Sequence, residues 1–493
     1  MKTTARQMPD AFVILFVVAV LAWFAGMWIP EGQYQTVEKT LANGSTRTVI
    51  DPDSYQRQAP ELQNSQIPLF AEGGEPGLLN VPFEGLVSGS KWGSAIGVVA
   101  FILVVGGAFG IIMKTGAVDR GIRQLIGSGE RALNIMLPVI FVLFSLGGAV
   151  FGMGEEAIAF CIILVPMVVA LGFDSITAVL ITYVATQIGF ATSWMNPFSV
   201  AIAQGIADVP ALSGMPFRAG CWLVFTGLGL WFTMRHAHRI AANPQSSPVY
   251  GQDDFFRLQH SEENQQQSFS KGDALVLLTL LGGIIWVIWG VIWRHYYIPE
   301  IASQFFTIGL LCGIIAMVFR LNGMSANDVA DGFKQGAADL LPAALIVALA
   351  KGVLMLLGGD DATEPSALNT ILHWAGQGLG EFSSMTSAQL MLLFQSVFNF
   401  FIASGSGQAA LTMPLMAPLS DLVGVSRQIS VLAFQLGDGL TNIIIPTSAS
   451  LIGCLGVARI DWGVWFRFIW PLQLALYGTA AAAMAIAVLI DFT

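Results

Sequence analysis

Long apolar stretches recur along the chain from residue 11 to residue 490, separated by polar segments. Seven of them are about 20 residues or longer, which is the length of helix that crosses a hydrocarbon core of roughly 30 Å. They are residues 11–30, 94–114, 217–235, 273–293, 303–320, 340–358 and 464–490. The pattern predicts membrane-spanning α-helices.

Two further apolar regions, residues 176–207 and 428–458, are longer than one span requires. At about 1.5 Å per residue, a helix of this length would measure roughly 46 Å, well beyond the bilayer core. We therefore expect each to be a broken helix. The residues able to break them are Asn196 and Pro197 in the first, and Gly437, Gly439 and Pro446 in the second.

Another two apolar regions, residues 134–171 and 388–422, are too long for one span and too interrupted for two. Each has a glycine-rich polar centre, GMGEE at 152–156 and SGSGQ at 404–408. Two short helical arms that meet at such a tip form a re-entrant hairpin. Irregular backbone is tolerated at membrane depth only where protein or water satisfies its polar groups.

The distribution of basic residues predicts the orientation. With residues 1–10 in the cytoplasm and nine spans plus two hairpins, 14 of the 22 Lys and Arg fall on the cytoplasmic side. Residues 11–30 are too long for the apolar core of a signal peptide, so we expect them to remain as the first span. Residues 236–271 then form a cytoplasmic linker between two membrane halves, residues 11–235 and 272–493, and residues 31–92 form an outer loop.

The two halves share an ordered series of short matches. The tip at 152–157 matches 405–410, 253 residues later, and Gln187-Ile188-Gly189 matches Gln435-Leu436-Gly437. The segments that follow, NPFS at 196–199 and IPTS at 445–448, match in the same order. In the predicted topology the two hairpins open from opposite sides, so the repeats are inverted. Inverted repeats with broken helices are typical of secondary transporters with a site near the midplane.

Three sequence features resemble one carrier family. They are the run GGAFGIIMKTGA at 106–117, the two hairpin tips, and QAALTMPLMAPLSDLVGVSRQ at 408–428. They resemble the YfcC and DcuC-type carriers of the ion transporter superfamily, which includes the aminobenzoyl-glutamate and divalent anion:sodium carriers. The resemblance implies a homodimer in the bacterial inner membrane, with a scaffold and a mobile domain that moves as an elevator. It also implies dicarboxylate, basic amino acid or peptide substrates.

The hairpin tips and broken helices supply the candidate substrate site. Helix N-termini at a break present unpaired N–H groups suited to a substrate carboxylate. Glu155 and Glu156 are ionisable groups at membrane depth, where such groups are by default functional, although they could instead cap the second arm. The glycines could instead serve close packing. The predicted substrate-binding residues are Gly152, Gly154, Glu155, Glu156, Asn196, Ser404, Gly405, Ser406, Gly407, Gln408, Asp438 and Asn442.

The broken helices also supply hydroxyl, amide and carboxylate oxygens suited to a hard cation such as Na⁺. The predicted ion-binding residues are Ser193, Asn196, Pro197, Asp438, Thr441, Asn442 and Thr447. Asp438 could instead bind a proton or an amine. Lys351 lies inside a span, where it could pair with these carboxylates or meet an anionic substrate.

Composition narrows the class further. Hydrophobic residues make up 55% of the chain and charged residues 11%, which indicates an all-α polytopic membrane protein. The net charge of −10 argues against a nucleic-acid partner. The four cysteines show no metal or disulfide spacing, none of the five histidines lies in a span, and no nucleotide-binding or hydrolase motif occurs. We therefore expect neither an enzyme nor a cofactor.

The charges of the predicted site indicate which of the possible substrates fits it best. The predicted site holds Glu155, Glu156 and Asp438 against one cation, Lys351. A carrier of doubly anionic acids should offer cations, so the residues favour a small carboxylate that also bears an amino group, such as an amino acid or short peptide. Uptake would be driven by Na⁺ or H⁺. A C4-dicarboxylate carrier, or a basic amino acid antiporter of the arginine/ornithine type, remains the alternative.

Overall fold

The computed structural model gives the chain a mostly helical fold. The predicted N-terminal segment 1–10 and the predicted ion-binding residue Pro197 lie outside the residues that it describes. The described residues are 11–40, 46–58, 67–91, 95–118, 120–121, 130–196, 199–207, 209–210, 213–259, 269–294, 296, 298–359, 361, 363–379 and 382–492.

Helices occupy all seven predicted spans. They are α1 (Ala11–Trp28), α3 (Ile96–Lys114), α10 (Met215–Ala242), α12 (Lys271–Arg294), α13 (Ile298–Val318), α14 (Ala326–Met355) and α20 (Trp462–Leu489). Among the described residues, α3, α13, α14 and α20 are long and apolar enough to cross a membrane. Together with the shorter apolar helices, they support a multi-pass membrane protein. The count of nine spans stays a prediction.

Helix α14 begins well before the predicted start at residue 340. Ser325 caps its N-terminus by accepting a hydrogen bond from the Asp328 N–H, while the Asp328 carboxylate accepts the N–H of Ser325. This reciprocal capping box satisfies two otherwise unpaired donors and fixes the first turn. The apolar pattern did not predict this early start of α14, because residues 326–339 include several charged side chains.

Both predicted hairpin regions form two helices joined at the glycine-rich tip. The first pair is α5 (Glu130–Phe151) and α6 (Glu156–Ala170), and Phe144 of α5 contacts Phe160 of α6 edge to face at 5.1 Å. The second pair is α16 (Ser384–Asn399) and α17 (Gly405–Leu422). Whether either pair is re-entrant in a bilayer stays a prediction.

The two long apolar regions are interrupted, as expected. The first consists of α7 (Ser175–Val179), a π-helical turn η2 (Leu180–Val184), α8 (Ala185–Ala191) and, after a gap, α9 (Val200–Ala207). The second consists of α18 (Arg427–Asn442) and α19 (Ala449–Ala458), separated by residues 443–448. Pro446 therefore lies in the break.

The prediction that Gly437 and Gly439 break the second helix is wrong, because both lie inside α18. Their missing side chains serve helix packing. A Cβ on Gly439 would lie 2.6 Å from the Ala191 backbone of α8, and one on Gly437 would lie 2.7 Å from Cβ of Gln395 in α16. These glycines bring α18 against α8 and α16.

Predicted loops contain short elements. The predicted outer loop, residues 31–92, holds β1 (Gly32–Gln33), β2 (Thr36–Thr40), β3 (Thr46–Ile50), η1 (Pro52–Ser54), β4 (Gln56–Arg57) and α2 (Val81–Val87). Strand β1 pairs antiparallel with β4, and β2 with β3. Elsewhere lie η3 (Pro244–Ser246), α11 (Asp254–Gln259), η4 (Leu321–Gly323) and α15 (Ala367–Leu379). The predicted outer loop at 31–92 and the predicted linker at 236–271 thus contain short strands and helices, while the side of the membrane on which each lies stays a prediction.

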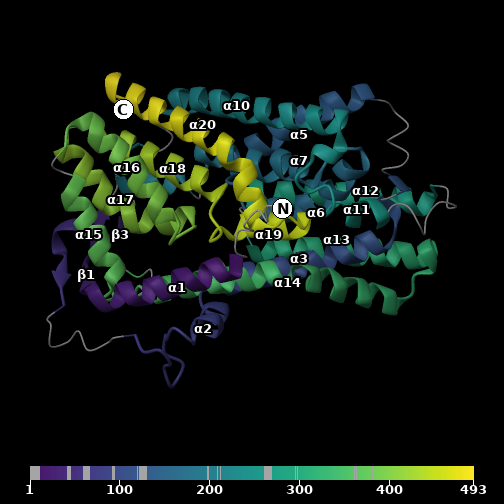
Figure 1. The fold of residues 1–493 in the computed structure, drawn as a ribbon, viewed down its shortest axis with the longest axis horizontal. Helices are drawn as coiled ribbons and strands as arrows, with labels where there is room; N and C mark the ends of the chain where they lie inside the picture. The colour runs from purple at the N-terminus through teal and green to yellow at the C-terminus, as the bar shows by residue number, and fades with distance from the viewer. Residues whose placement is uncertain are drawn as a thin grey trace, which may run out of the picture.

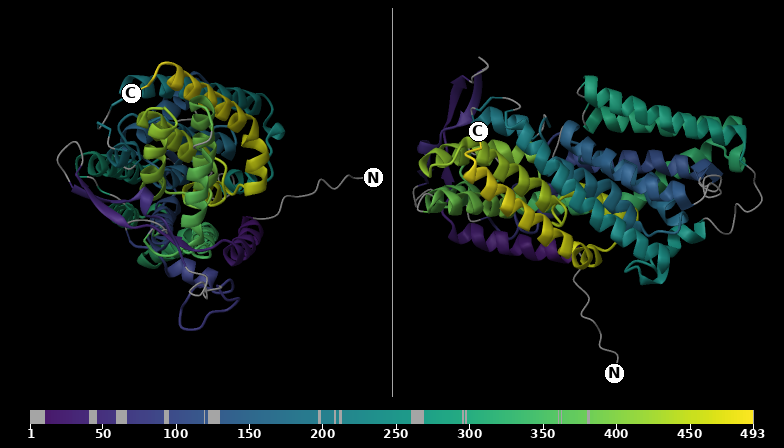
Figure 2. Two further views of the ribbon diagram at one scale, coloured as in Figure 1. Left: turned by 90° about the vertical axis from the view of Figure 1, so that its left-hand side faces the viewer. Right: turned by 90° about the horizontal axis from the view of Figure 1, so that it is seen from above.

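The helices form two groups. In the first, here the α14 group, α14 packs on α1, α2 and α3, and α3 packs on the α12–α13 pair. The second, here the hairpin group, combines α5–α9 and α16–α19 with α10 and α20. Figure 1 shows α1, α3 and α14 along the lower edge and α10 and α20 along the upper edge. Figure 2, seen from above, shows the α12–α13 pair at one margin.

Paired glycines hold α3 against α14. A Cβ on Gly336 would lie 2.2 Å from the Gly106 carbonyl oxygen, and one on Gly110 would lie 2.1 Å from that of Gly332. Each helix thus carries two glycines four residues apart on the shared face. Such spacing lets helix backbones approach closely in membrane proteins.

Candidate functional site

The tip of the first hairpin meets the break of the first long helix. A Cβ on Gly152 would stand 2.3 Å from Oδ1 of Asn196, and Gly152 has a φ of +73°, which glycine adopts without strain. The break is held by Ser193, whose hydroxyl accepts the Asn196 N–H at 2.9 Å and donates to the Ala149 carbonyl at 2.6 Å. Gly152, Ser193 and Asn196 are therefore brought together.

The tip of the second hairpin meets α18. A Cβ on Gly405 would stand 3.0 Å from Oδ2 of Asp438 and 2.9 Å from the ring of Phe190 in α8. The second tip thus touches a helix from each repeat. Only a residue without a side chain fits this contact without a shift of its neighbours.

Asp438 is buried and carries a carboxylate with one satisfied oxygen. Its Oδ1 accepts a hydrogen bond from the Asn442 amide at 3.0 Å, whereas Oδ2 has no partner among the described residues. Asn399 of α16 donates from Nδ2 to the Asp438 carbonyl and to Asn442 Oδ1, both at 3.0 Å. These contacts fix Asp438 and leave one carboxylate oxygen for a ligand cation or a proton.

The two glutamates of the first tip differ in role. Glu156 is buried, and its Oε2 accepts the N–H of Gly154 at 2.9 Å, so it ties the tip to the start of α6. Glu155 is half-buried, and it lies near enough to Asp438 and Tyr183 for its charge to act on both. Glu155 therefore stays a candidate for the site, while Glu156 organises the tip.

Several buried oxygen atoms around the two breaks have no hydrogen-bond partner among the described residues. A buried oxygen without a donor is costly unless an ion, a proton or a water meets it. The atoms are Ser199 Oγ, Gln187 Oε1, Asn399 Oδ1, Gln408 Oε1, Asp438 Oδ2 and Thr447 Oγ1. They come from both repeats and are the donor type that a hard cation takes.

Other predicted residues have partners of their own. Thr441 of α18 donates to the Gly437 carbonyl or pairs with the Tyr477 hydroxyl of α20, so it faces α20. Ser404 is exposed and caps α17 by accepting the Gly407 N–H at 3.4 Å. Ser406 is also exposed, and Gln408 donates to the Gln395 carbonyl at 2.8 Å.

Three helices begin at the site. They are α6, α17 and α19, with N-caps Glu155, Ser404 and Ser448 respectively. A helix N-terminus presents free N–H groups and a partial positive charge, which suits a carboxylate. The structure thus places anion-attracting helix ends beside the Asp438 and Glu155 carboxylates.

Two polar residues of the site were missed from the sequence. Asn399 lies five residues before the predicted tip, and Tyr183 lies in the π-helical turn. The Tyr183 hydroxyl donates to the Asn442 carbonyl at 2.7 Å and lies 3.0 Å from the Ser448 hydroxyl, so it links the two repeats. The sequence signal that could have identified these two residues is a single polar residue within an apolar run. π-Helical turns frequently occur at functional sites.

A buried cation also lies behind the site. Arg218 of α10 is 1% exposed and donates to the side-chain oxygens of Gln435 and, at 2.9 Å, Gln428, both in α18. Gln435 in turn donates to the Ser193 carbonyl at 2.5 Å. Lys351 lies in α14, half-buried. Arg218 therefore adds a positive charge that the sequence interpretation did not include.

The chain matches one carrier family and is similar in sequence to two known proteins. Residues 8–489 match the family described as DcuC, C4-dicarboxylate anaerobic carrier. The chain is 53% identical over 474 residues, 94% of each chain, to YfcC of Escherichia coli (strain K12), whose name describes it provisionally as a basic amino acid antiporter. It is 29% identical over 504 residues, 96% of this chain and 95% of the other, to an uncharacterized protein of Haemophilus influenzae (strain ATCC 51907 / DSM 11121 / KW20 / Rd).

Two solved transporter structures are also similar. The YdaH transporter of Alcanivorax borkumensis aligns with a TM-score of 0.40 at 15% identity, covering 98% of this chain and 99% of that one. MtrF of Neisseria gonorrhoeae, described with a class of antimetabolite efflux pumps, aligns with a TM-score of 0.41 at 15% identity, covering 98% and 96%.

Proposed function

This chain belongs to the DcuC family of membrane carriers and is not an enzyme, and from that premise we propose that it transports a small carboxylate bearing an amino group. The transport is secondary and driven by a Na⁺ or H⁺ gradient across the bacterial inner membrane. Basic amino acids are the first substrates to test, because YfcC bears the name of such an antiporter. Short peptides fit the same chemistry.

The observation that carries the proposal is the free oxygen of the buried Asp438 carboxylate, at the contact between the second tip and α18. A buried carboxylate is costly unless a cation or proton compensates it. Glu155, half-buried nearby, adds a second negative charge. This arrangement suits an ammonium or guanidinium group better than a second carboxylate.

The substrate carboxylate would meet the helix ends. The N-termini of α6 and α17 lie at the two tips, so their N–H groups serve as donors close to the acidic residues. A molecule with both charges could then be held by both kinds of contact. The unpartnered oxygens of Asn399 and Thr447 are candidate ligands of a coupling Na⁺, and Asp438 is the candidate carrier of a coupling proton.

The division into two helical groups supports an elevator mechanism as part of this proposal. The site lies wholly within the hairpin group, which would move as a unit against the α14 group. The proposed homodimer rests on the family resemblance.

A second candidate function is C4-dicarboxylate transport, which the description of the matching family favours. Arg218 offers the positive charge that such a substrate needs, but Gln435 stands between it and the Ser193 carbonyl at the break. The two functions therefore differ in which charged residues transport requires.

The test is uptake into proteoliposomes that contain the purified protein. Labelled L-arginine, L-ornithine, a dipeptide and succinate would each be presented under an imposed Na⁺ or proton gradient, and with unlabelled solute inside. We expect uptake or exchange of an amino-bearing solute, reduced more than tenfold by Asp438→Asn, because a hydrogen bond to a charged group contributes about 1.5–3 kcal/mol. Glu155→Gln should weaken uptake in the same direction.

The matched control is Asp331→Asn, which also converts an aspartate to its amide. Asp331 is exposed on α14, outside the hairpin group, and pairs with Lys334 at 3.0 Å. It should leave transport unchanged. Succinate uptake that survives Asp438→Asn and Glu155→Gln would reject the amino-bearing substrate and leave the dicarboxylate carrier.

A further inference from the structure

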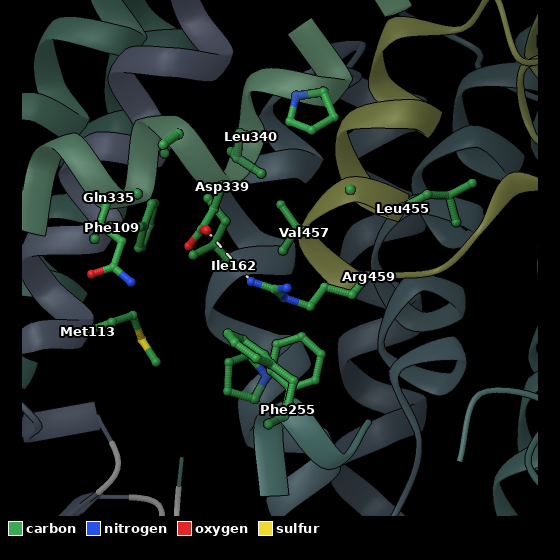
Figure 3. A pocket seen from close by; sticks show the side chains of 18 of the residues that line it. Phe109, Met113, Ile162, Phe255, Gln335, Asp339, Leu340, Leu455, Val457 and Arg459 are labelled. Carbon is green, nitrogen blue, oxygen red and sulfur yellow. Dashed lines mark ion pairs between the residues drawn. The ribbon is translucent and has the colours of Figure 1, made fainter. Parts of the chain in front are cut away.

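A cavity of about 910 Å³ lies on the seam between the two helical groups. Helices α3 and α14 contribute Met113 and Gln335 to one wall, and α6 and α19 contribute Ile162 and Leu455 to the other (Figure 3). Because α6 and α19 both begin at the candidate site, the cavity runs beside two helices that lead away from it. It is therefore placed to serve as a vestibule of that site.

An ion pair crosses this vestibule. Asp339 of α14 and Arg459, directly after α19, approach to 3.6 Å, and Figure 3 shows their side chains pointing toward one another across the cavity. Their side chains are 49% and 42% exposed. A charge-assisted hydrogen bond would measure about 2.7–2.9 Å, so this pair is loose and accessible. A ligand with charges of its own could separate it.

The backbone conformation of Arg459 and its contact with the Phe255 ring position its side chain at the vestibule. Its φ of +53° lies in the left-handed region, where a helix end usually has glycine. Its guanidinium carbon lies 3.5 Å from the ring centre of Phe255 in α11, which covers one face of the planar group. Strained backbone at a charged residue is a reason to look for a function.

Two cations, Lys114 and Arg459, and two carboxylates, Asp339 and Asp461, line the vestibule. Lys114 pairs with Asp328 at 3.6 Å, and Asp461 accepts a hydrogen bond from Gln252 at 3.2 Å. Arg459 and Asp339 are left facing each other, one positive and one negative. A dianion would be attracted by Arg459 but repelled by Asp339, whereas a zwitterion complements both.

We propose that Asp339 and Arg459 form a vestibular site for the zwitterionic head group of an α-amino acid. The α-carboxylate binds Arg459 and the α-ammonium binds Asp339, each replacing the other residue as partner. At about 1.5 Å per residue, Arg459 lies roughly 16 Å along α19 from Ser448, so this site is separate from the one at the tips. The inference rests on the proposed function in that the transported solute bears both groups.

Protection from chemical labelling tests this without requiring transport. Gln335→Cys places a thiol on the exposed vestibule wall, and the four native cysteines are all buried. The rate of its modification by a methanethiosulfonate reagent would be measured with L-arginine, with agmatine, which lacks the carboxylate, and with 5-guanidinopentanoate, which lacks the α-amine. We expect L-arginine to protect at about tenfold lower concentration than either analogue, the loss of one charge-assisted contact.

Two added variants separate this site from the central one. Protection by L-arginine should persist with Asp438→Asn, which disables the proposed central site, and should be lost with Arg459→Gly. Glycine suits the left-handed backbone at this position, so that variant should fold, and Arg459→Lys should restore part of the protection. Equal protection by agmatine, or protection that Asp438→Asn removes and Arg459→Gly leaves, would overturn the vestibular site. The transport assay can fail independently of this result.

Discussion

Gly405 faces the Asp438 carboxylate so closely that a Cβ added to Gly405 would lie only 3.0 Å from Oδ2. That oxygen has no hydrogen-bond partner among the described residues. The glycine therefore allows the second hairpin tip to lie against the acidic group of the site without covering it with a side chain.

The first prediction is that Gly405→Ala impairs transport. The added methyl group would crowd Asp438 and the Phe190 ring, at 3.0 and 2.9 Å, and push the tip away from α18. Overpacking of this kind costs about 1–3 kcal/mol, which corresponds to a rise in KM of about fivefold to roughly 150-fold if the strain falls on the bound state. Initial uptake rates in proteoliposomes measure it.

The control for Gly405→Ala is Gly478→Ala in α20. A Cβ on Gly478 meets nothing within 4 Å, and alanine favours a helix by about 0.5–1 kcal/mol over glycine. It should leave KM unchanged. If both alanine variants transport equally well, the tip contact has no part in substrate binding.

The second prediction concerns the glycines between α3 and α14. Gly336→Ala would place a methyl group 2.2 Å from the Gly106 carbonyl oxygen, so the two helices must separate. We expect a loss of about 1–3 kcal/mol in unfolding free energy, measured as a lower thermal unfolding midpoint in detergent.

Gly282→Ala in α12 is the matched variant, since its Cβ would meet nothing within 4 Å. It should keep or slightly raise the midpoint. A Gly336→Ala protein as stable as the Gly282→Ala protein would show that α3 and α14 can separate at little cost.

The two helix pairs and the broken helices were predictable because each interrupts a long apolar run with glycine, proline or polar residues. The role of a particular glycine was not. Gly152 lies at a tip, whereas Gly437 and Gly439 lie inside α18. The sequence does not distinguish a glycine that breaks a helix from one that lets a neighbouring helix approach. The two roles differ only in which residues pack against the glycine.

The site was predictable to the extent that its residues lie at these interruptions. Asn196 lies at a break and Gly405 at a tip, as predicted, whereas Asp438 lies inside α18, between the two glycines that were wrongly predicted to break it. Tyr183 was not, because its partner Asn442 lies 259 residues away, and nothing local distinguishes a tyrosine that links two repeats from one that fills a core. The vestibular pair, Asp339 and Arg459, depends equally on packing between distant helices.

The third prediction is that Arg120→Met destabilises the α14 group. Arg120 donates to Asp273 at 2.7 and 2.9 Å, and both side chains are at most 2% exposed. Removal of one partner leaves a buried charge uncompensated, so we expect a loss of about 3–5 kcal/mol in unfolding free energy.

Two further variants serve as controls for Arg120→Met. Lys334→Met breaks the exposed pair with Asp331 and should cost less than about 1 kcal/mol. The double variant Arg120→Met with Asp273→Leu removes both charges and should recover much of the loss. If the double variant is no more stable than Arg120→Met alone, the uncompensated charge is not the cause.

The fourth prediction concerns pH and the linker, which docks on the start of α7. Oδ2 of Asp253 accepts the Ser175 N–H at 3.2 Å, with Arg257 at 3.9 Å and the negative Asp174 nearby. Burial raises the pKa of Asp253 from 3.8 to about 6, the hydrogen bonds from Ser175 oppose the rise, and Asp174 adds to it. Ionisation therefore weakens the docked state.

The direction of the pH dependence of docking follows from the raised pKa of Asp253. Below about pH 4 the carboxyl is neutral in both the docked and the undocked state, and the penalty grows as pH rises from about 4 to about 6. Docking should thus be stronger at pH 5 than at pH 7, by roughly tenfold for these two pKa values. Hydrogen exchange of residues 247–259, corrected for the intrinsic pH dependence, measures it.

Asp253→Asn should abolish this pH dependence, because its amide stays neutral throughout. Asp254→Asn is the neighbouring control, since Asp254 is exposed and pairs with Arg257 at 2.6 Å. It should keep the difference between pH 5 and pH 7. A pH dependence that persists in Asp253→Asn would show that Asp253 is not its source.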